Sequence, residues 1–168
     1  MHDQSTLRGP GSNSFRYNRP IDGGIAFSGM PTDRELCDEL ACYTLAHADP
    51  AFLHQHVMDA FAAQNADETC RPIGVWFALV GLYLFIEKGF TGRQVQRIHM
   101  QLANRRKQWP RLTPPQDRGK LTVSAVLAAL PGPERDAKIR EWCGSVWGAW
   151  GAVRDQIKER VKAELNIV

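Results

Sequence analysis

Residues 73–86, IGVWFALVGLYLFI, decide the fold, because this stretch is long, apolar and free of charge. It is shorter than the ~20 residues that a helix needs to cross a bilayer, and Arg71 and Glu87 close it on either side. A helix that is apolar on all faces is typical of the centre of a helical domain. The stretch therefore predicts a buried central helix rather than a membrane span. Gly74 and Gly81 share nearly one face of this helix and predict the close approach of a neighbouring helix.

Capping signals place further helices on both sides of this central one. Thr32 with Glu35, and Thr91 with Gln94, have the spacing of capping boxes, so each pair is expected to open a helix. Another helix is expected over residues 50–65, with Pro50 in its first turn, where the missing N–H does no harm. Short connections between these helices predict antiparallel neighbours.

The second half of the chain predicts a loop and two more helices. Residues 111–121 contain two adjacent prolines and a glycine, and this loop is long enough to cover one mouth of a bundle. Thr122 can cap a short helix, and a last helix is expected over residues 134–166. We therefore predict an all-α, single-domain bundle of four to five main helices with a long C-terminal helix.

The N-terminal region differs in composition from the rest. Residues 1–31 are rich in Gly, Ser, Asn, Pro and Arg and lack apolar periodicity, which predicts a flexible arm in front of a bundle domain at residues 32–168. The arm lacks the apolar core of a secretory signal, so export is not expected. The four cysteines form no C-x-x-C pair, which favours free thiols in a reducing compartment. We expect a cytoplasmic protein.

Charge is unevenly distributed along a chain whose net charge is +3. Acidic residues gather between positions 32 and 68, and basic residues between positions 91 and 120. The two regions could compensate each other across the bundle, or the basic one could bind phosphate or nucleic acid. Because the basic region has one aromatic residue, Trp109, and no glycine-rich phosphate loop, compensation is favoured and nucleic-acid binding is not expected.

The most polar helical stretch is residues 54–65, HQHVMDAFAAQN. At about 100° per residue, His54 and Gln64 fall on the apolar side of this helix. His56 and Asp59 fall on the opposite side, one turn apart, where they can hydrogen-bond each other. The stretch therefore predicts two separate polar clusters rather than one.

The first cluster is a candidate metal site. His99 lies on the apolar side of the helix that Thr91 opens, so it could meet His54 across the bundle. With a third donor from Asp38, Glu39 or His47, the two imidazoles would suit a divalent transition metal. No H-x-x-x-H or E-x-x-H pair supports this site, and core histidines that bond a carbonyl or an amide are the more common outcome.

The second cluster, His56 with Asp59, has the order of a general base and the carboxylate that orients it. Cys37, Cys42 and Ser145 are the residues that could approach it as a nucleophile. An ordinary pair on the surface or between helices is the favoured interpretation. The catalytic candidates are thus His54, His56, Asp59 and His99.

Four segments carry a resemblance to a known family. They are HQHVMDAFAAQ at 54–64, FALVGLYL at 77–84, GRQVQRIHM at 92–100 and WCGSVW at 142–147. Over roughly residues 33–150 the chain resembles a group of uncharacterised bacterial proteins classed as a domain of unknown function. Members of that group tend to carry a histidine after the glutamine that corresponds to Gln64, where this chain has Asn65. The resemblance implies a bacterial origin and a shared helical fold, and it supplies no activity.

Two classes of function follow from these residues. The first is a small-molecule enzyme with a histidine-containing pocket between the second, third and fourth helices. In one version of this hypothesis the pocket also binds a metal. Its ligand-binding candidates are Gln64, Trp76, Tyr83 and Arg97. The alternative is a non-catalytic binding or assembly module that uses the basic face at 93–111 or the tryptophan-rich last helix. Exposed aromatic surface on that last helix would favour a homodimer.

Overall fold

The computed structural model describes residues 30–47, 49–105 and 108–165, and every regular element in these ranges is a helix. The elements are α1 (Asp33–Ala46), α2 (Leu53–Gln64), α3 (Pro72–Ile86), α4 (Gly92–Ala103), α5 (Val123–Leu127), α6 (Pro133–Ala149), the 3-10 turn η1 (Gly151–Val153) and α7 (Arg154–Leu165). The predicted all-α fold is confirmed. None of the helices in the described ranges has both the length and the apolar character needed to span a bilayer. The arm predicted at residues 1–31 lies almost wholly outside the described residues.

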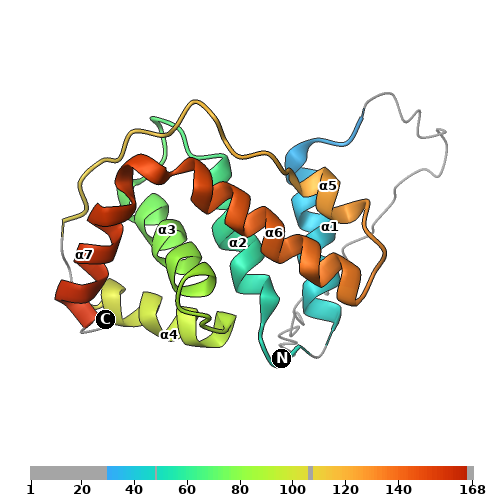
Figure 1. The fold of residues 1–168 in the computed structure, drawn as a ribbon, viewed down its shortest axis with the longest axis horizontal. Helices are drawn as coiled ribbons and strands as arrows, with labels where there is room; N and C mark the ends of the chain where they lie inside the picture. Colours follow the sequence, from blue (N-terminus) through green and yellow to red (C-terminus); the bar gives the residue numbers. More distant parts are fainter. Residues whose placement is uncertain (1–29, 48, 106–107, 166–168) are drawn as a thin grey trace, which may run out of the picture. The chain divides into compact units, whose positions relative to one another are not determined.

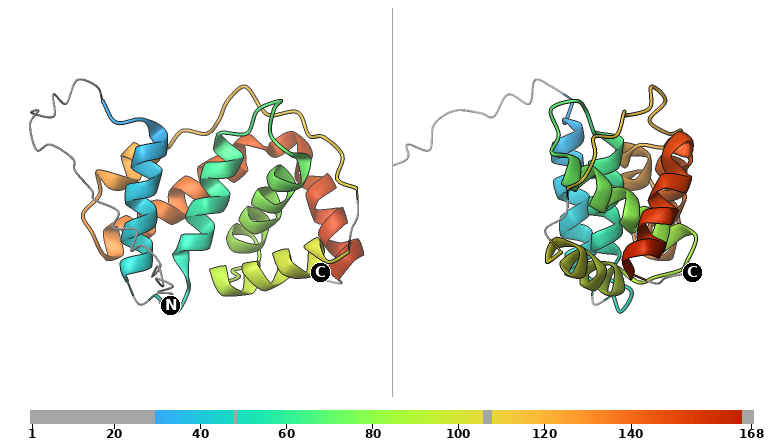
Figure 2. Two further views of the ribbon diagram at one scale, coloured as in Figure 1. Left: turned by 180° about the vertical axis from the view of Figure 1, so that it is seen from behind. Right: turned by 90° about the vertical axis from the view of Figure 1, so that its left-hand side faces the viewer.

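Helix α3 is the centre of the core, as the apolar run predicts. Most of its residues are buried, and α2, α4, α6 and α7 all pack against it. Figures 1 and 2 show α2 beside α3, α4 across one end of α3, and α6 running across α2. Helix α5 contacts α1 and α6 at the other side of the bundle.

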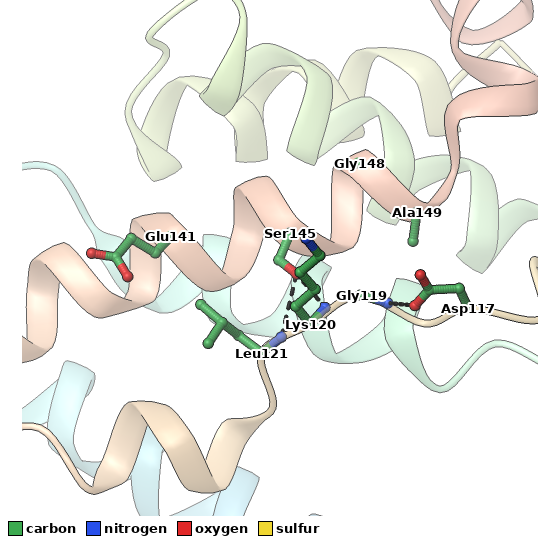
Figure 3. A pocket seen from close by; sticks show the side chains of 8 residues that line it. All are labelled: Asp117, Gly119, Lys120, Leu121, Glu141, Ser145, Gly148 and Ala149. Carbon is green, nitrogen blue, oxygen red and sulfur yellow. Dashed lines mark hydrogen bonds between the residues drawn. The ribbon is translucent and has the colours of Figure 1, made fainter.

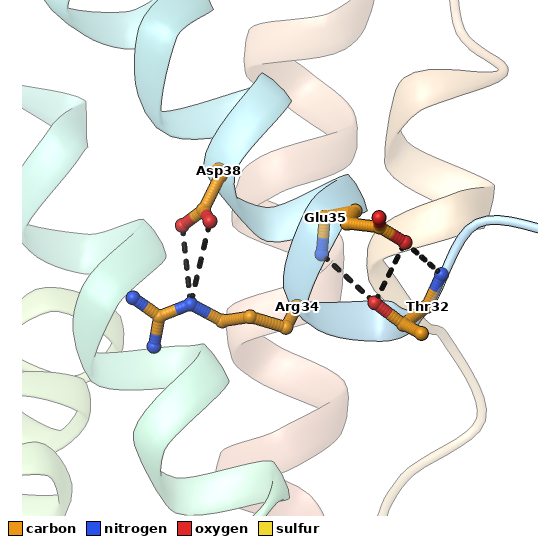
Figure 4. A network of polar contacts seen from close by, with 4 residues as sticks. All are labelled: Thr32, Arg34, Glu35 and Asp38. Carbon is orange, nitrogen blue, oxygen red and sulfur yellow. Dashed lines mark hydrogen bonds and ion pairs between the residues drawn. The ribbon is translucent and has the colours of Figure 1, made fainter. Parts of the chain in front are cut away.

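Both capping boxes that the sequence predicts are formed. The Glu35 backbone N–H donates to Thr32 Oγ1 at 3.3 Å, and the Thr32 N–H donates to Glu35 Oε2 at 2.8 Å (Figure 4). The Thr91 N–H likewise donates to Gln94 Oε1 at 2.8 Å. These boxes fix the first turns of α1 and α4, because each satisfies N–H groups that a helix start leaves without partners.

Helix α2 begins later than the sequence predicts. Pro50 lies outside it, and the residue before its first turn is Phe52, with φ at 56° in the left-handed region. The carboxylate of Asp49 accepts hydrogen bonds from the Ala51 N–H at 2.8 Å and the Leu53 N–H at 2.6 Å. Asp49 therefore organises the entry to α2 in place of the proline.

The C-terminal helical region is divided, and its aromatic residues face inward. It comprises α6, η1 and α7, with the break after Ala149. Trp142, Trp147 and Trp150 are each exposed by 2% or less. The tryptophans proposed as a partner face therefore lie in the core, and binding of a partner by the last helix stays a prediction.

Residues 108–122, which we call the belt, cross from the α4 side to α5 without regular helix. The belt arches over the ends of α2 and α3 (Figure 1), as expected for a loop that covers one mouth of the bundle. The Trp76 indole N–H holds its beginning, by donating to the Pro110 carbonyl at 2.7 Å.

The arginines of the basic region fasten the belt to the bundle. Arg118 donates to the Ala66 carbonyl at 2.6 Å, and Arg111 donates to the carbonyls of Glu68 and Cys70. Two arginines of the basic region thus reach the acidic region or its end, but they bind backbone carbonyls, and the compensation of charge between the two regions stays a prediction. These arginines are engaged in the fold.

Candidate functional site

The buried face of α2 is rotated relative to the prediction and overlaps the predicted face only in part, at Val57. His56 and Asp59, expected on the side away from the core, are exposed by only 1% and 4%, whereas His54 is half-buried. The core side of α2 also carries Ala60 and Ala63. Alanines are only weakly hydrophobic, so they contribute little to the apolar face seen in a helical projection. They nevertheless let neighbouring helices approach closely. Val57 is buried as the apolar stripe predicts, but Phe61 is only half-buried, so the stripe located one edge of the interior and not its centre.

His54 and His99 each bond to a different neighbour. His54 Nδ1 lies 3.1 Å from Thr44 Oγ1 on α1, and burial lowers the pKa of His54. His99 Nε2 lies 2.9 Å from the Phe77 carbonyl on α3, and the two rings stack with centroids 5.1 Å apart. Burial lowers the pKa of His99 to about 4. Both rings fasten one helix to another: His99 bonds a carbonyl, as expected for core histidines, whereas His54 bonds a hydroxyl.

The three-donor metal site is not formed by the described side chains. Among them, no group of three or more His, Cys, Asp or Glu residues is arranged to hold a metal ion. Of the donors named for it, Asp38 pairs with Arg34 at 3.2 Å, and His47 Nδ1 lies 2.7 Å from the Tyr43 carbonyl.

A second polar group, which we call the buried cluster, consists of His56, Asp59 and Cys143 between α2, α3 and α6. The His56 ring stacks on the Phe85 ring, with centroids 3.6 Å apart and planes inclined by 11°. Asp59 Oδ1 accepts from Gln55 Nε2 at 3.0 Å. The predicted bond between His56 and Asp59 is absent, since among the described residues His56 Nδ1, His56 Nε2 and Asp59 Oδ2 have no partner.

Burial disfavours the charged forms of the side chains in the buried cluster. Burial, with a smaller contribution from the nearby Arg140 guanidinium, lowers the pKa of His56 to about 4. Burial raises the pKa of Asp59 well above its ordinary value, and the hydrogen bond from Gln55 only partly opposes this. It also raises the pKa of the Cys143 thiol. The cluster can therefore lie in the core without counter-charges, because the charged forms are the ones that desolvation penalises.

Gly81 on α3 makes room for this cluster. A Cβ atom at Gly81 would lie 1.9 Å from Asp59 Oδ2 and 2.6 Å from Asp59 Cγ. The close approach predicted from the two glycines thus occurs at Gly81. Gly74 is exposed and has open space around it.

The predicted ligand-binding residues serve other roles in the structure. Gln64 Nε2 donates to the carbonyls of Arg118 at 3.0 Å and Leu121 at 2.7 Å, while its Oε1 accepts from the Trp142 indole at 2.9 Å. Trp76 and Tyr83 are buried, and Arg97 is exposed on α4. Gln64 therefore anchors the belt from inside the bundle, and these four residues do not surround one pocket.

The belt is joined to α6 along a narrow seam. Ser145 Oγ accepts hydrogen bonds from the backbone N–H groups of Lys120 at 2.6 Å and Leu121 at 3.3 Å. Gly119 has φ at 96°, and a Cβ atom there would lie 2.9 Å from Ser145 Oγ. Only glycine fits this position, because both the backbone conformation and the space exclude a side chain.

An open groove of about 580 Å³ runs beside this seam. One wall is α6, with Glu141, Ser145, Gly148 and Ala149, and the other is the belt, with Asp117, Gly119, Lys120 and Leu121 (Figure 3). The absence of large side chains at Gly148 and Ala149 leaves this face of α6 open. None of the catalytic candidates named from the sequence lines the groove.

Sequence reasoning missed the groove because its residues have no chemical signature. In the sequence, Ser145 is one of three possible nucleophiles, and Lys120 is one base within the basic region at 91–120. The available signal was Gly119 at the end of a long loop, followed by small residues at helical spacing on the last helix. That pattern indicates close packing of a loop on a helix, but not the residues that meet there.

The model of a family of unknown function (DUF5946) matches residues 29–151. The chain belongs to this family. No curated protein and no solved structure matches the chain. The DUF5946 match covers α1 to α6, so it includes the buried cluster, the belt and the groove, and it agrees with the resemblance to a domain of unknown function.

Proposed function

We propose that this DUF5946 protein binds a small molecule in the groove between α6 and the belt. The observation that carries the proposal is the groove itself, since about 580 Å³ lies within the range of roughly 300–1,000 Å³ that is typical of ligand sites. Its lining combines apolar surface with a few polar groups, which is the usual composition of such sites.

The construction of the belt supports this proposal. Ordering a backbone residue costs about 1–2 kcal/mol of conformational entropy, and the belt has no helix to offset that cost. Side chains from other elements offset it instead, with Gln64 inside the bundle and Ser145 on α6 binding its backbone. Long irregular segments in compact domains are commonly functional loops. A loop fastened in this way provides a rigid wall for a ligand.

The proposal does not include catalysis. His56 and Asp59 do not line the groove, so the catalytic roles predicted for them, for His54 and for His99 stay predictions. The homodimer also stays a prediction, now without the exposed tryptophans on which it was based. The cytoplasmic location and the bacterial origin likewise stay predictions.

The test uses phenylnaphthylamine, a neutral aromatic dye that becomes fluorescent in apolar sites. Gly148 is exposed, and a Cβ atom there meets only Arg154 Nη2 at 3.7 Å, so the Gly148→Trp variant should fold and fill the groove. We expect its affinity for the dye to fall by at least about tenfold, because a tryptophan takes the volume that the dye occupies. The matched control is Ala163→Trp, at an exposed residue of α7, which should bind as the wild type does.

Circular dichroism checks that both variants keep the wild-type helix content. The proposal fails if the wild-type protein does not bind the dye at micromolar concentrations. It also fails if Gly148→Trp binds the dye as well as the wild type and Ala163→Trp do.

A further inference from the structure

The groove contains three charged side chains, and two of them already have partners. Asp117 Oδ1 accepts a hydrogen bond from the Gly119 N–H at 2.9 Å. Glu141 Oε2 accepts from Lys138 Nζ at 2.6 Å. Both carboxylates are therefore used within the fold.

Lys120 is the third charged group, and its ammonium has no hydrogen bond or ion pair with the described residues. Its backbone is nevertheless held firmly, because its N–H donates to Ser145 Oγ at 2.6 Å. The ammonium thus extends from a fixed point on the wall of an otherwise largely apolar groove.

We infer that the ligand of this groove is a small amphipathic anion, with its apolar body against Leu121 and Ala149 and its acidic group beside Lys120. This inference rests on the proposed function and names the class of ligand. A carboxylate or a sulfonate supplies the negative charge that would pair with the Lys120 ammonium. At this end of the groove a cationic group is disfavoured, because the Lys120 ammonium would repel it.

The test compares two dyes with the same aromatic body. Anilinonaphthalene sulfonate carries an anionic sulfonate that phenylnaphthylamine lacks, so the ratio of their affinities isolates the charge. We expect Lys120→Gln to weaken binding of the sulfonate about two- to fivefold, which is the range for one exposed ion pair. Binding of the neutral dye should not change. The matched control is Lys162→Gln, at an exposed lysine of α7, which should leave both affinities as they are.

The failures of the two proposals differ. If Gly148→Trp abolishes binding of both dyes but Lys120→Gln leaves their affinity ratio unchanged, the inference about the anion is wrong and the groove remains a ligand site. If Gly148→Trp affects neither dye, the proposed function is wrong and the inference falls with it. Raising the salt concentration gives a second measurement, because an ion pair at an exposed lysine is screened. Salt should reduce the preference for the sulfonate in the wild type, and do so less in Lys120→Gln.

Discussion

The two faces of α6 differ in how the polar groups beside them are hydrogen-bonded. Its inner face meets the buried cluster, where three polar atoms of His56 and Asp59 have no partner among the described residues. Its outer face meets the belt, where one hydroxyl, that of Ser145, accepts two backbone N–H groups. An unpartnered buried polar group costs about 1–3 kcal/mol, so the cluster lowers stability while the seam raises it. The residues that look most catalytic are thus buried and neutral, and an inconspicuous serine helps to build the open site.

The largest expected effect is at Gly81. A Gly81→Ala substitution places Cβ 1.9 Å from Asp59 Oδ2, and this carboxylate is buried. We expect it to lower the free energy of unfolding by about 3 kcal/mol, the upper end for overpacking a core, as measured by urea denaturation. Gly74→Ala on the same helix is the control, since Gly74 is exposed with open space around it. It should be neutral or slightly stabilising, because alanine favours helix.

A double variant identifies the cause. If the clash with Asp59 is responsible, Asp59→Ala combined with Gly81→Ala should be more stable than Gly81→Ala alone, because removing the carboxylate makes room for the methyl group. A loss of stability in Gly81→Ala that Asp59→Ala does not reduce would contradict the packing of Asp59 against α3.

The next effect is a pH dependence that comes from the buried cluster. The pKa of His56 falls from 6.5 to about 4 on folding, so the unfolded chain binds the proton more readily. Stability is therefore lost as the pH falls below about 6.5, at up to roughly 1.4 kcal/mol per pH unit for one histidine. His56→Phe keeps the stacking on Phe85 and removes the titration. It should reduce the loss of stability between about pH 7 and pH 4.5 by about 2 kcal/mol.

Asp59 should give the opposite slope. Its pKa is raised in the folded state, so its contribution to stability decreases as the pH rises above its unfolded value of about 3.9. Asp59→Asn should therefore gain stability relative to the wild type as the pH increases.

Urea denaturation at several pH values measures both slopes, and His47→Phe, at an exposed histidine, is the control for His56→Phe. Parallel pH profiles for the wild type and His56→Phe would show that His56 is not buried as described.

The sequence predicts the parts of the fold that local interactions determine. Thr32 and Thr91 cap their helices through residues three positions away. Most of the apolar run at 73–86 is buried, because exposing any apolar face of it to water is unfavourable. The orientation of α2 could not be predicted in this way. It depends on Gly81 of another helix making room for Asp59, which a projection of α2 alone does not contain.

The groove depends on contacts between residues that are even further apart in the chain. Gln64 binds the belt at Leu121, 57 positions away, and Ser145 binds it at Lys120, 25 positions away. Hydrogen bonds of this kind, from a side chain to a distant backbone group, leave no periodic pattern and no motif in the sequence. The sequence therefore predicts a loop that covers the bundle. It does not predict the seam between this loop and α6, or the lysine beside the seam.

The smallest expected effect tests the seam directly. Ser145→Ala removes the acceptor of two belt N–H groups, but Lys120 is exposed and water can replace part of the loss. We expect a decrease of about 1 kcal/mol in the free energy of unfolding and a weaker affinity for phenylnaphthylamine. Gln156→Ala, at an exposed residue of α7, should change neither. The dye is the more informative measurement, because a serine that only stabilised the fold would lower stability without affecting the groove. A Ser145→Ala variant that loses stability and keeps wild-type affinity would therefore separate the seam from the ligand site.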